Sequence, residues 1–565
     1  MAVYKNLKVD IPKEHVIIEN RKDGKPALVK YVLSAVNDRQ KGYAVPKRTT
    51  IGHQCPDDPD RMNPTGKYRE IFPDRWKELT GTDVAPDVKR IGLFAFSQAV
   101  NARTGIKNLL NQIYGHECAD ALMDYALYLL SLGSEPSGPS DYQDFASEEL
   151  LYSGQVRSDF WYADPVSHRM SEQQSLLFRR KWAMQCHERG VQEVLLVIDG
   201  SNEDGRNRGV ELVGEDTAKA DKNKAIVSFA LAVTKEGLPV SFDCFEGGLT
   251  NTDALQKILT FLSECGITVK GVILERGYCT KTVLHFLSDH HLPYLFLVTG
   301  ECPGIWEVTQ QYGPLIRMNA EYLIEGTSLF GIQKSVRLFP EDTREDFATL
   351  YYDCERAGAD VAALLTDVGK ALERVKTALA TGEPLRADPK YSRLIHITTT
   401  ISDGNTVRDA RIVPEELQKA IDEKGLFSIV SSEETDPTEI QKWCAAPHAC
   451  EAPFGVLKGK LGFGSVRLSY STGITSRALA AFVTSVLRFE AGQAKGEDDL
   501  TEQVIEEVDS LSMKKIGDVY ACTHAGNREM REISGLFSRL GADAAELLEG
   551  AVKFENSRLA GKRKE

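Results

Sequence analysis

The sequence predicts an α/β protein whose central part is a mixed β-sheet with helices between its later strands. Three observations predict it. An apolar run from Val194 to Ile198 ends in Asp199 and Gly200, strand-like and helix-like stretches then follow in a regular order up to residue 298, and the fourth strand-like stretch ends in Glu275. Short apolar runs bounded by turn residues are typical of buried strands, and apolar spacings of three and four are typical of helices.

The elements of this central part are predicted in chain order. After the strand at 194–198 come strand-like stretches at 225–233 and 238–245, divided by the turn Lys235-Glu236-Gly237. Then follow a helix at 252–265, a strand at 269–274, a helix at 280–290 and a strand at 293–298. The order β-β-β-α-β-α-β is that of an RNase H-like core. That fold places the first and fourth strands side by side, so we expect Asp199 and Glu275 at adjacent strand ends.

The other segments are predicted from the positions of Gly and Pro residues and from the spacing of apolar residues. Residues 1–80 hold many Gly and Pro residues and predict a basic, β-rich segment with a hairpin from Lys41 to Gly52. Residues 81–190 predict helices, interrupted by a linker at 134–140. We expect 191–300 and 425–490 to form one core, interrupted by an insertion domain at 301–424 with strands at 348–352 and 394–401 and a helix at 361–379. Residues 491–565 predict a helical C-terminus.

Composition limits the class of protein. The chain has 565 residues, 42% of them hydrophobic and 27% charged, which is typical of globular proteins. No apolar run approaches the roughly 18 residues of a membrane helix, and the first residues lack a signal-peptide pattern. The 11 cysteines are never spaced Cys-x-x-Cys, so neither a disulfide framework nor a zinc site is predicted. We expect a cytoplasmic protein.

Net charge is −14, whereas nucleic-acid binding usually rests on Lys and Arg. The excess of acidic residues is unevenly distributed along the chain. Residues 490–510 hold eight acids against Lys495, and residues 1–70 hold 14 Lys and Arg against nine Asp and Glu, a net charge of +5. On charge alone an ordinary acidic cytosolic protein is favoured.

Four stretches resemble the DDE transposases of bacterial insertion sequences, of the family-four type with its 1634-like relatives. "IDGSN" is similar to the first-acid motif, and "KAIVSFALAVTKEGLPVSFDCFEGGLTNTDALQKIL" to the hairpin that follows it. "VILERGYCTKTVLHFL" resembles the second-acid motif, which normally reads Asp-Arg-Gly. "CEAPFGVLKGKLGFGSVRLSYSTGITSRALAAFVTSVLR" resembles the third-acid segment, in which a Glu precedes a Lys by seven residues.

The resemblance implies a polynucleotidyl transferase with an RNase H-like core. Asp199, Glu275 and Glu451 would be its catalytic acids and would hold two Mg²⁺ ions, for which Mn²⁺ may substitute. Double-stranded DNA would be the partner, as the terminal repeats of the element and as the target, bound by a homodimer on the nucleoid. We expect DNA contacts from the basic side chains near the acids and from the basic residues of the first two segments: Lys458, Arg276, Arg179, Arg180, Lys181, Lys47 and Arg48.

Several departures from the family pattern leave alternatives open. Glu275 stands where the family has Asp, and one methylene moves a carboxylate by about 1.5 Å. Glu275 is either a ligand in an adapted site or a mark of decay. Glu451 lies among Pro447, Pro453 and several glycines, which disfavour a helix. Asp253, at a helix start, is a structural residue first and a site-shaping one second.

Three rivals to an active transposase therefore stand. The first is a catalytically degenerate, transposase-derived DNA-binding protein. The second is a metal-dependent nuclease without strand transfer. The third is a cytosolic protein unrelated to DNA.

Overall fold

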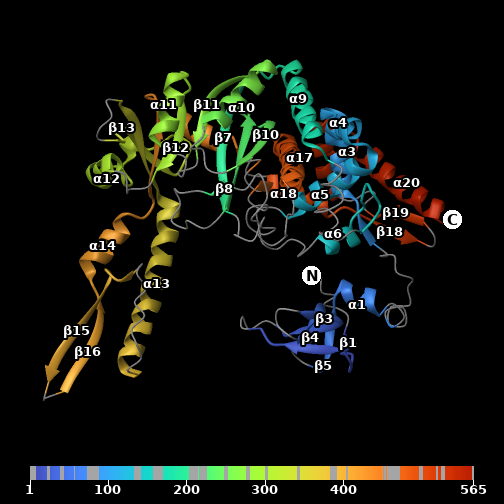
Figure 1. The fold of residues 1–565 in the computed structure, drawn as a ribbon, viewed down its shortest axis with the longest axis horizontal. Coiled ribbons are helices and arrows are strands. Elements are labelled where there is room, and N and C mark those ends of the chain that lie inside the picture. The colour runs from blue at the N-terminus through green and yellow to red at the C-terminus, as the bar shows by residue number, and fades with distance from the viewer. Residues whose placement is uncertain are drawn as a thin grey trace. The chain divides into compact units, whose positions relative to one another are not determined.

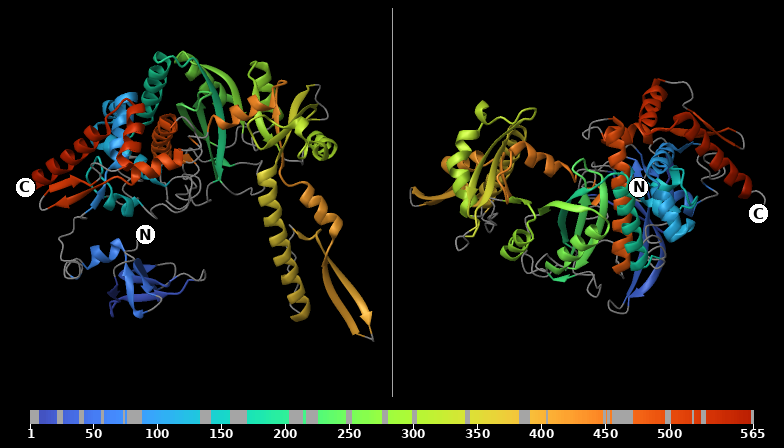
Figure 2. Two further views of the ribbon diagram at one scale, coloured as in Figure 1. Left: turned by 180° about the vertical axis from the view of Figure 1, so that it is seen from behind. Right: turned by 90° about the horizontal axis from the view of Figure 1, so that it is seen from above.

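The structure is a computed structural model in which the chain divides into two compact units. One unit comprises residues 1–185, 203–212 and 448–565, and the other comprises 186–202 and 213–447. Figures 1 and 2 show the ribbon. The structure describes residues 8–21, 26–38, 43–55, 58–72, 75, 88–132, 142–156, 170–202, 214–215, 225–246, 252–274, 280–298, 303–339, 344–381, 391–402, 405–447, 450, 453–454, 471–495, 501–516, 519–523 and 528–562.

The unit that holds residues 213–447 is built on a nine-stranded mixed sheet. Its first part follows the predicted order closely: β7 (Glu193–Asn202), β8 (Gly214–Glu215), β9 (Ala225–Val233), β10 (Pro239–Glu246), α10 (Thr252–Glu264), β11 (Thr268–Leu274), α11 (Lys281–Asp289) and β12 (Tyr294–Val298). The spatial order is β10-β9-β7-β11-β12, with β8 paired to β9. β7, β11 and β12 are parallel, and β9 and β10 are antiparallel to their neighbours. The expected mixed α/β class is confirmed, as is the adjacency of the first and fourth strands.

The sheet continues beyond β12 into the predicted insertion. The next strands are β17 (Leu426–Ser431), β14 (Asp346–Asp353) and β13 (Leu329–Val336), all antiparallel to their neighbours. α12 (Pro303–Ile316) packs on these strands, and the 3₁₀ turn η3 (Ala320–Tyr322) precedes β13. The segment 301–424 is therefore not a separate fold, because two of its strands extend the main sheet by way of β17.

The rest of that segment forms an arm. It consists of α13 (Cys354–Thr381), the hairpin β15 (Ile395–Ser402) with β16 (Asn405–Ile412), and α14 (Pro414–Asp422). α13 and the hairpin extend away from the sheet in the same direction (Figures 1 and 2). A small core of Val368, Ala371, Tyr391 and Leu394 joins them, and the predicted helix and strand within the arm are both present.

The second unit contains a helical core. It includes α3 (Gly92–Thr104), α4 (Ile106–Tyr114), α5 (His116–Ser131), α6 (Tyr142–Glu148), most of α9 (Glu172–Glu188), α17 (Ser471–Lys495), α18 (Thr501–Asp509), α19 (Arg528–Arg539) and α20 (Ala544–Lys562). Phe178 and Trp182 pack against Phe482, with ring centroids 6.3 and 6.4 Å apart. Thr484 donates to the carbonyl of Ala126 at 3.0 Å, which fixes α17 against α5. α17 thus lies in this unit, although the sequence placed residues up to 490 in the core with β7 to β12.

The C-terminal region is not wholly helical. β18 (Ser512–Ile516) and β19 (Val519–Cys522) form a hairpin, and β18 also pairs with β6 (Val88–Arg90). Lys89 in β6 forms a 2.7 Å ion pair with the buried Glu555 of α20. β18 and β6 were missed because charged side chains occupy strand positions in them, and β19 was missed because it has only four residues.

The N-terminal segment is β-rich, as predicted. Its sheet has the order β1-β5-β4-β3-β2, formed by β1 (Val9–Asp10), β2 (Val16–Glu19), β3 (Leu28–Asp38), β4 (Tyr43–Cys55) and β5 (Asp58–Pro64), with α1 (Gly66–Ile71) following. Within the predicted hairpin at 41–52, residues 43–52 lie in a single strand, β4, which pairs with β3 along most of its length and with β5 at its end. Pro46 is tolerated because it lies opposite Ala35 in the half of β4 that β5 does not reach.

A buried carboxylate organises the loop after α6. Asp124 in α5 is fully buried and accepts hydrogen bonds from the backbone N–H groups of Tyr152 and Ser153 at 2.6 and 3.0 Å. Burial raises the pKa of Asp124 to about 7, and the hydrogen bonds from Ser153 and Tyr152 oppose this rise. The loop is further fixed by a 2.8 Å hydrogen bond between the hydroxyls of Ser97 and Tyr152.

Asp124 predicts a pH-dependent stability. A carboxyl whose pKa is higher in the folded than in the unfolded state contributes fully below pH ~4, and its contribution is lost as the pH rises through about 7. Between pH 5 and pH 8 the wild type is therefore expected to lose unfolding free energy relative to Asp124→Asn, as measured by urea midpoints. The exposed Glu117→Gln in the same helix is the control and should follow the wild type. Identical pH slopes for wild type and Asp124→Asn would contradict the assignment.

Candidate active site

The candidate site lies at Asp199 in β7 and beyond the last residue of β11, Leu274. β7 continues to Asn202, so Asp199 lies within the strand and not at its end, where the sequence had predicted it. In the parallel pairing of these strands, Ile198 is aligned with Leu274, so the next aligned positions in the sequence are Asp199 and Glu275. Within β7, Asp199 is also paired with the buried Phe229 of β9. The backbone of Asp199 is thus part of the sheet. β11 ends at Leu274, the residue before Glu275. The side chain of Asp199 and all of residue 275 lie outside the described residues.

Helix α15 (Pro437–Ala445) covers one face of this part of the sheet. A Cβ atom on Gly271 would lie 2.3 Å from the Trp443 ring, so the indole packs directly on the backbone of β11. Gly271 is aligned with Leu195 in β7, and every second residue of a strand shares a face. The position of Asp199, four residues after Leu195, therefore belongs to the face on which α15 lies.

The start of α15 is fixed by three contacts. The Asp436 side chain accepts from the N–H of Thr438 at 2.8 Å as an N-cap, and the Tyr351 hydroxyl donates to the carbonyl of Pro437 at 2.8 Å. Glu439 forms ion pairs with Lys235 and Lys442 at 2.8 and 2.7 Å. Hydrogen bonds from Lys235 and then Lys442 lower the pKa of Glu439 to about 2. The β9–β10 turn, through Lys235, is thus tied to α15.

α15 was not predicted from the sequence. A signal was present, because a glycine inside a strand often marks close approach of another element. Gly271→Ala is expected to lower the unfolding free energy by about 1–3 kcal/mol, since the added methyl overpacks against Trp443. Gly358→Ala is the matched control: no atom lies within 4 Å of its added Cβ, and replacing a helical glycine should be neutral or stabilising. Urea unfolding compares the two, and an equal response of both variants would contradict the contact.

The other predicted acids and their neighbours lie largely outside the described residues. This holds for Glu275, Arg276, Glu451 and Lys458. Cys450, directly before Glu451, is buried, and residues 453–454 are helical. Asp253 is exposed in the first turn of α10, as expected for a residue at a helix start.

The predicted DNA-binding side chains differ in exposure. On α9, Lys181 is exposed, whereas Arg179 and Arg180 are half-buried. The charge of Arg179 lies near the buried phenol of Tyr114 and opposes the rise in that group's pKa. On β4, Arg48 is exposed, and the side chain of Lys47 lies outside the described residues. Lys181 and Arg48 are thus the described members of the set that solvent reaches most readily.

Metal ligation and membrane insertion can be assessed only for the described part of the chain. There, no group of three or more His, Cys, Asp and Glu side chains is placed to hold a metal ion. None of the helices described has the length and apolar character that crossing a bilayer needs. The three predicted acids are not part of that assessment, because their side chains are not described.

No protein-family model and no curated protein matches this chain. The geometry and the sequence motifs are therefore the basis for any functional assignment.

Proposed function

We propose that the protein is a DDE-type DNA transposase with an RNase H-like core, which cleaves DNA at the ends of its element and joins them to target DNA. One observation carries the proposal. β7 and β11 pair in parallel within the strand order β10-β9-β7-β11-β12, with Ile198 aligned to Leu274, and Asp199 and Glu275 are the residues that follow these two in the sequence. Two such positions are what a shared metal site at a sheet edge requires.

The residues fit magnesium by their chemistry, because Mg²⁺ prefers carboxylate oxygens and retains several waters. Asp199 and Glu275 would hold it from the sheet, and Glu451 would complete the set. When bound, a pair of such ions neutralises charge on the attacking and the leaving oxygens of a phosphodiester. The protein's own contribution is placement: β9 and β11 pair with β7 on either side and hold the backbone of Asp199 within the sheet.

The proposed reaction has two steps. A water oxygen first attacks the phosphorus at the element's end and displaces a 3′-oxygen, which takes up a proton as the 3′-hydroxyl. That hydroxyl then attacks a phosphorus of the target strand, and a new phosphodiester forms as one in the target breaks. Because the second step exchanges one phosphodiester bond for another, it needs no further co-reactant. Two DNA ends must be brought together, which supports a homodimer on DNA.

The net positive charge is confined to part of the chain and is not spread over its whole length. Residues 1–70 carry a net charge of +5, although the whole chain carries −14. Phosphate contacts position a protein on DNA without reading its sequence. The basic N-terminal segment, with Arg48 on β4, and Lys181 on α9 would supply such contacts.

The test is an assay with Mg²⁺ and DNA that carries the inverted repeats flanking the reading frame. Strand cleavage at the repeat and a joined product with target DNA are expected, and both should disappear with EDTA. Cleavage without a joined product would instead identify a nuclease. Salt-dependent binding without cleavage would identify a degenerate DNA-binding protein, and absence of binding would reject the proposal.

A further inference from the structure

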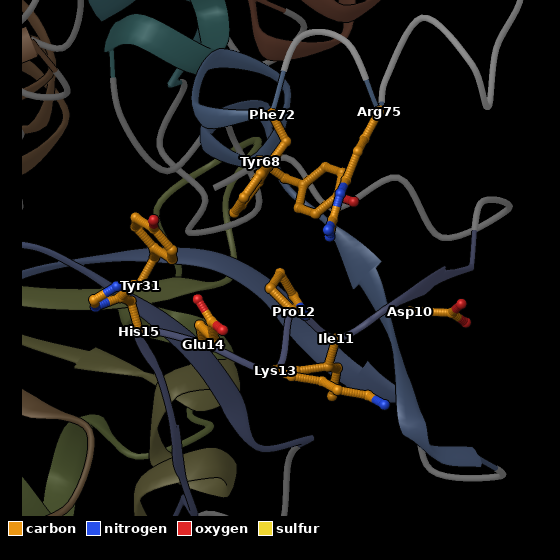
Figure 3. A pocket seen from close by; sticks show the side chains of 10 residues that line it. All are labelled: Asp10, Ile11, Pro12, Lys13, Glu14, His15, Tyr31, Tyr68, Phe72 and Arg75. Carbon is orange, nitrogen blue, oxygen red and sulfur yellow. The ribbon is translucent and has the colours of Figure 1, made fainter.

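A hollow in the N-terminal sheet is separate from the residues used so far. It has a volume of about 660 Å³ and lies between α1 and the segment that joins β1 to β2 (Figure 3). Ligand pockets of small molecules commonly have volumes of roughly 300–1,000 Å³. The side chains that matter for its chemistry are Glu14, His15, Tyr31, Tyr68, Phe72 and Arg75.

Aromatic rings form much of its wall. Tyr31 and Phe72 meet edge to face with centroids 5.3 Å apart, and Tyr68 lies 5.0 Å from Phe72. Tyr68 is 2% exposed and belongs to the core of the sheet, whereas Tyr31 and Phe72 are only half-buried. His15, at φ 59°, places its ring 6.1 Å from Tyr31. The hollow therefore offers partly exposed rings that are held in place by a buried one.

Charges of both signs accompany these rings. The Arg75 guanidinium lies 5.5 Å from the centroid of the Phe72 ring and reaches the Tyr68 phenol. In Figure 3 the Glu14 carboxylate points into the hollow from the opposite side, near Tyr31. Both residues are exposed. A simple anion would be repelled by Glu14, and an apolar ligand would leave both charges without a partner. The hollow suits a flat ring that carries N–H donors and is joined to an anionic group.

We propose that this hollow binds one unpaired nucleotide of single-stranded DNA. The base stacks on Tyr31, which Phe72 holds in place by its edge-to-face contact. The N–H groups of the base donate to Glu14, and its phosphate binds Arg75. Base stacking on aromatic side chains next to basic residues is the general means of single-strand recognition. The choice of DNA rests on the proposed function, and it agrees with the net positive charge of residues 1–70. The N-terminal segment thereby holds frayed or cut strand ends, rather than reading base pairs.

The experiment uses the full chain in EDTA, so that binding is measured without cleavage. The probe is a 12-nucleotide single strand with 2-aminopurine at its centre and fluorescein at one end. Wild type should quench the 2-aminopurine and raise the fluorescein anisotropy, and duplex of the same sequence should compete poorly. Phe72→Leu and Tyr31→Leu should each weaken binding by about tenfold and abolish the quenching.

A second pair of variants tests the charged side chains of the hollow. Arg75→Gln should weaken binding and lower the slope of log K against log salt by roughly 0.7, the loss of one phosphate contact on a single strand. Arg356→Gln removes an exposed arginine of α13, which pairs with Asp360 and has no part in the hollow or in the basic N-terminal segment, and it should bind as wild type does. Equal weakening by both variants would indicate a nonspecific charge effect and would overturn the proposal.

Two further outcomes keep this inference distinct from the proposed function. If Phe72→Leu and Arg75→Gln, shown folded by circular dichroism, bind and quench like wild type, the nucleotide site is rejected even where cleavage is intact. If wild type quenches the probe as expected but never cleaves DNA with Mg²⁺, the site stands and the transposase proposal fails. Since Arg75 is exposed, its substitution carries the test if Phe72→Leu does not fold.

Discussion

Asp199→Asn is expected to lower Mg²⁺-dependent strand cleavage by at least about 10³-fold while the sheet stays folded. Asparagine keeps the shape of the side chain and removes the charge that would hold the metal. A metal ion stabilises the transition state by several kcal/mol, and each 1.36 kcal/mol corresponds to a tenfold change in rate. The rate is measured as nicked product from end-containing DNA under single-turnover conditions.

The control for this variant is Asp243→Asn in the same sheet. Asp243 of β10 is paired with Ala230 of β9, which is in turn paired with Ile198 of β7, so it occupies the row before Asp199 two strands away. Asp243→Asn should cleave like wild type. The unfolding free energies of both variants, measured with urea, should lie within about 0.5 kcal/mol of the wild-type value. Full activity of Asp199→Asn would exclude Asp199 from the reaction.

Glu275 gives the second large effect, because it stands where the related transposases have aspartate. Glu275→Gln should reduce cleavage by at least about a hundredfold through loss of a metal ligand. Glu275→Asp should also reduce it, since retracting the carboxylate by about 1.5 Å misplaces a ligand in a site adapted to glutamate. The same single-turnover assay compares the three proteins.

Each alternative for Glu275 has its own signature. A rise in cleavage with Glu275→Asp would show that the glutamate is a decay mutation. Equal cleavage by Glu275→Gln and wild type would show that residue 275 is not a ligand. Glu193→Gln is the control: it lies at the other end of the same strand pair, where Glu193 pairs with Lys270 at 3.0 Å, and its cleavage rate should not change.

Local patterns predicted the first half of the large sheet because each strand there is a short apolar run between turn residues. β9 was predicted with the bounds that it has, and the turn before β10 is closed by Thr234 and Gly237 at φ 95°. α12 was missed because Gly304, Gly313 and Pro314 disfavour a helix. Close packing requires the first of these glycines: a Cβ on Gly304 would lie 2.7 Å from the carbonyl oxygen of Arg337.

The candidate site was predictable only in part, for a similar reason. The adjacency of β7 and β11, after which Asp199 and Glu275 were expected, was predictable because the order of elements is similar to that of an RNase H-like core. The contact of Trp443 with Gly271 joins residues far apart in the sequence, and the pairing of β18 with β6 spans the chain. Such contacts depend on the assembled fold and leave little periodicity in the sequence. The hollow beside Tyr31 likewise arises from segments that meet only after folding.

The position of β17 has a consequence for how the large sheet can assemble. Within the described strands, β10-β9-β7-β11-β12 form one hydrogen-bonded group and β14-β13 another, and β17 is the strand that pairs with both. The hairpins β9–β10 and β13–β14 are local in sequence and form early, whereas β17 must close a long loop to reach β12. Because β17 follows the whole arm in the chain, a ribosome releases it only after both groups have emerged. The two groups can therefore fold independently during synthesis, and the insertion of one six-residue strand, Leu426–Ser431, is the step that makes them a single sheet.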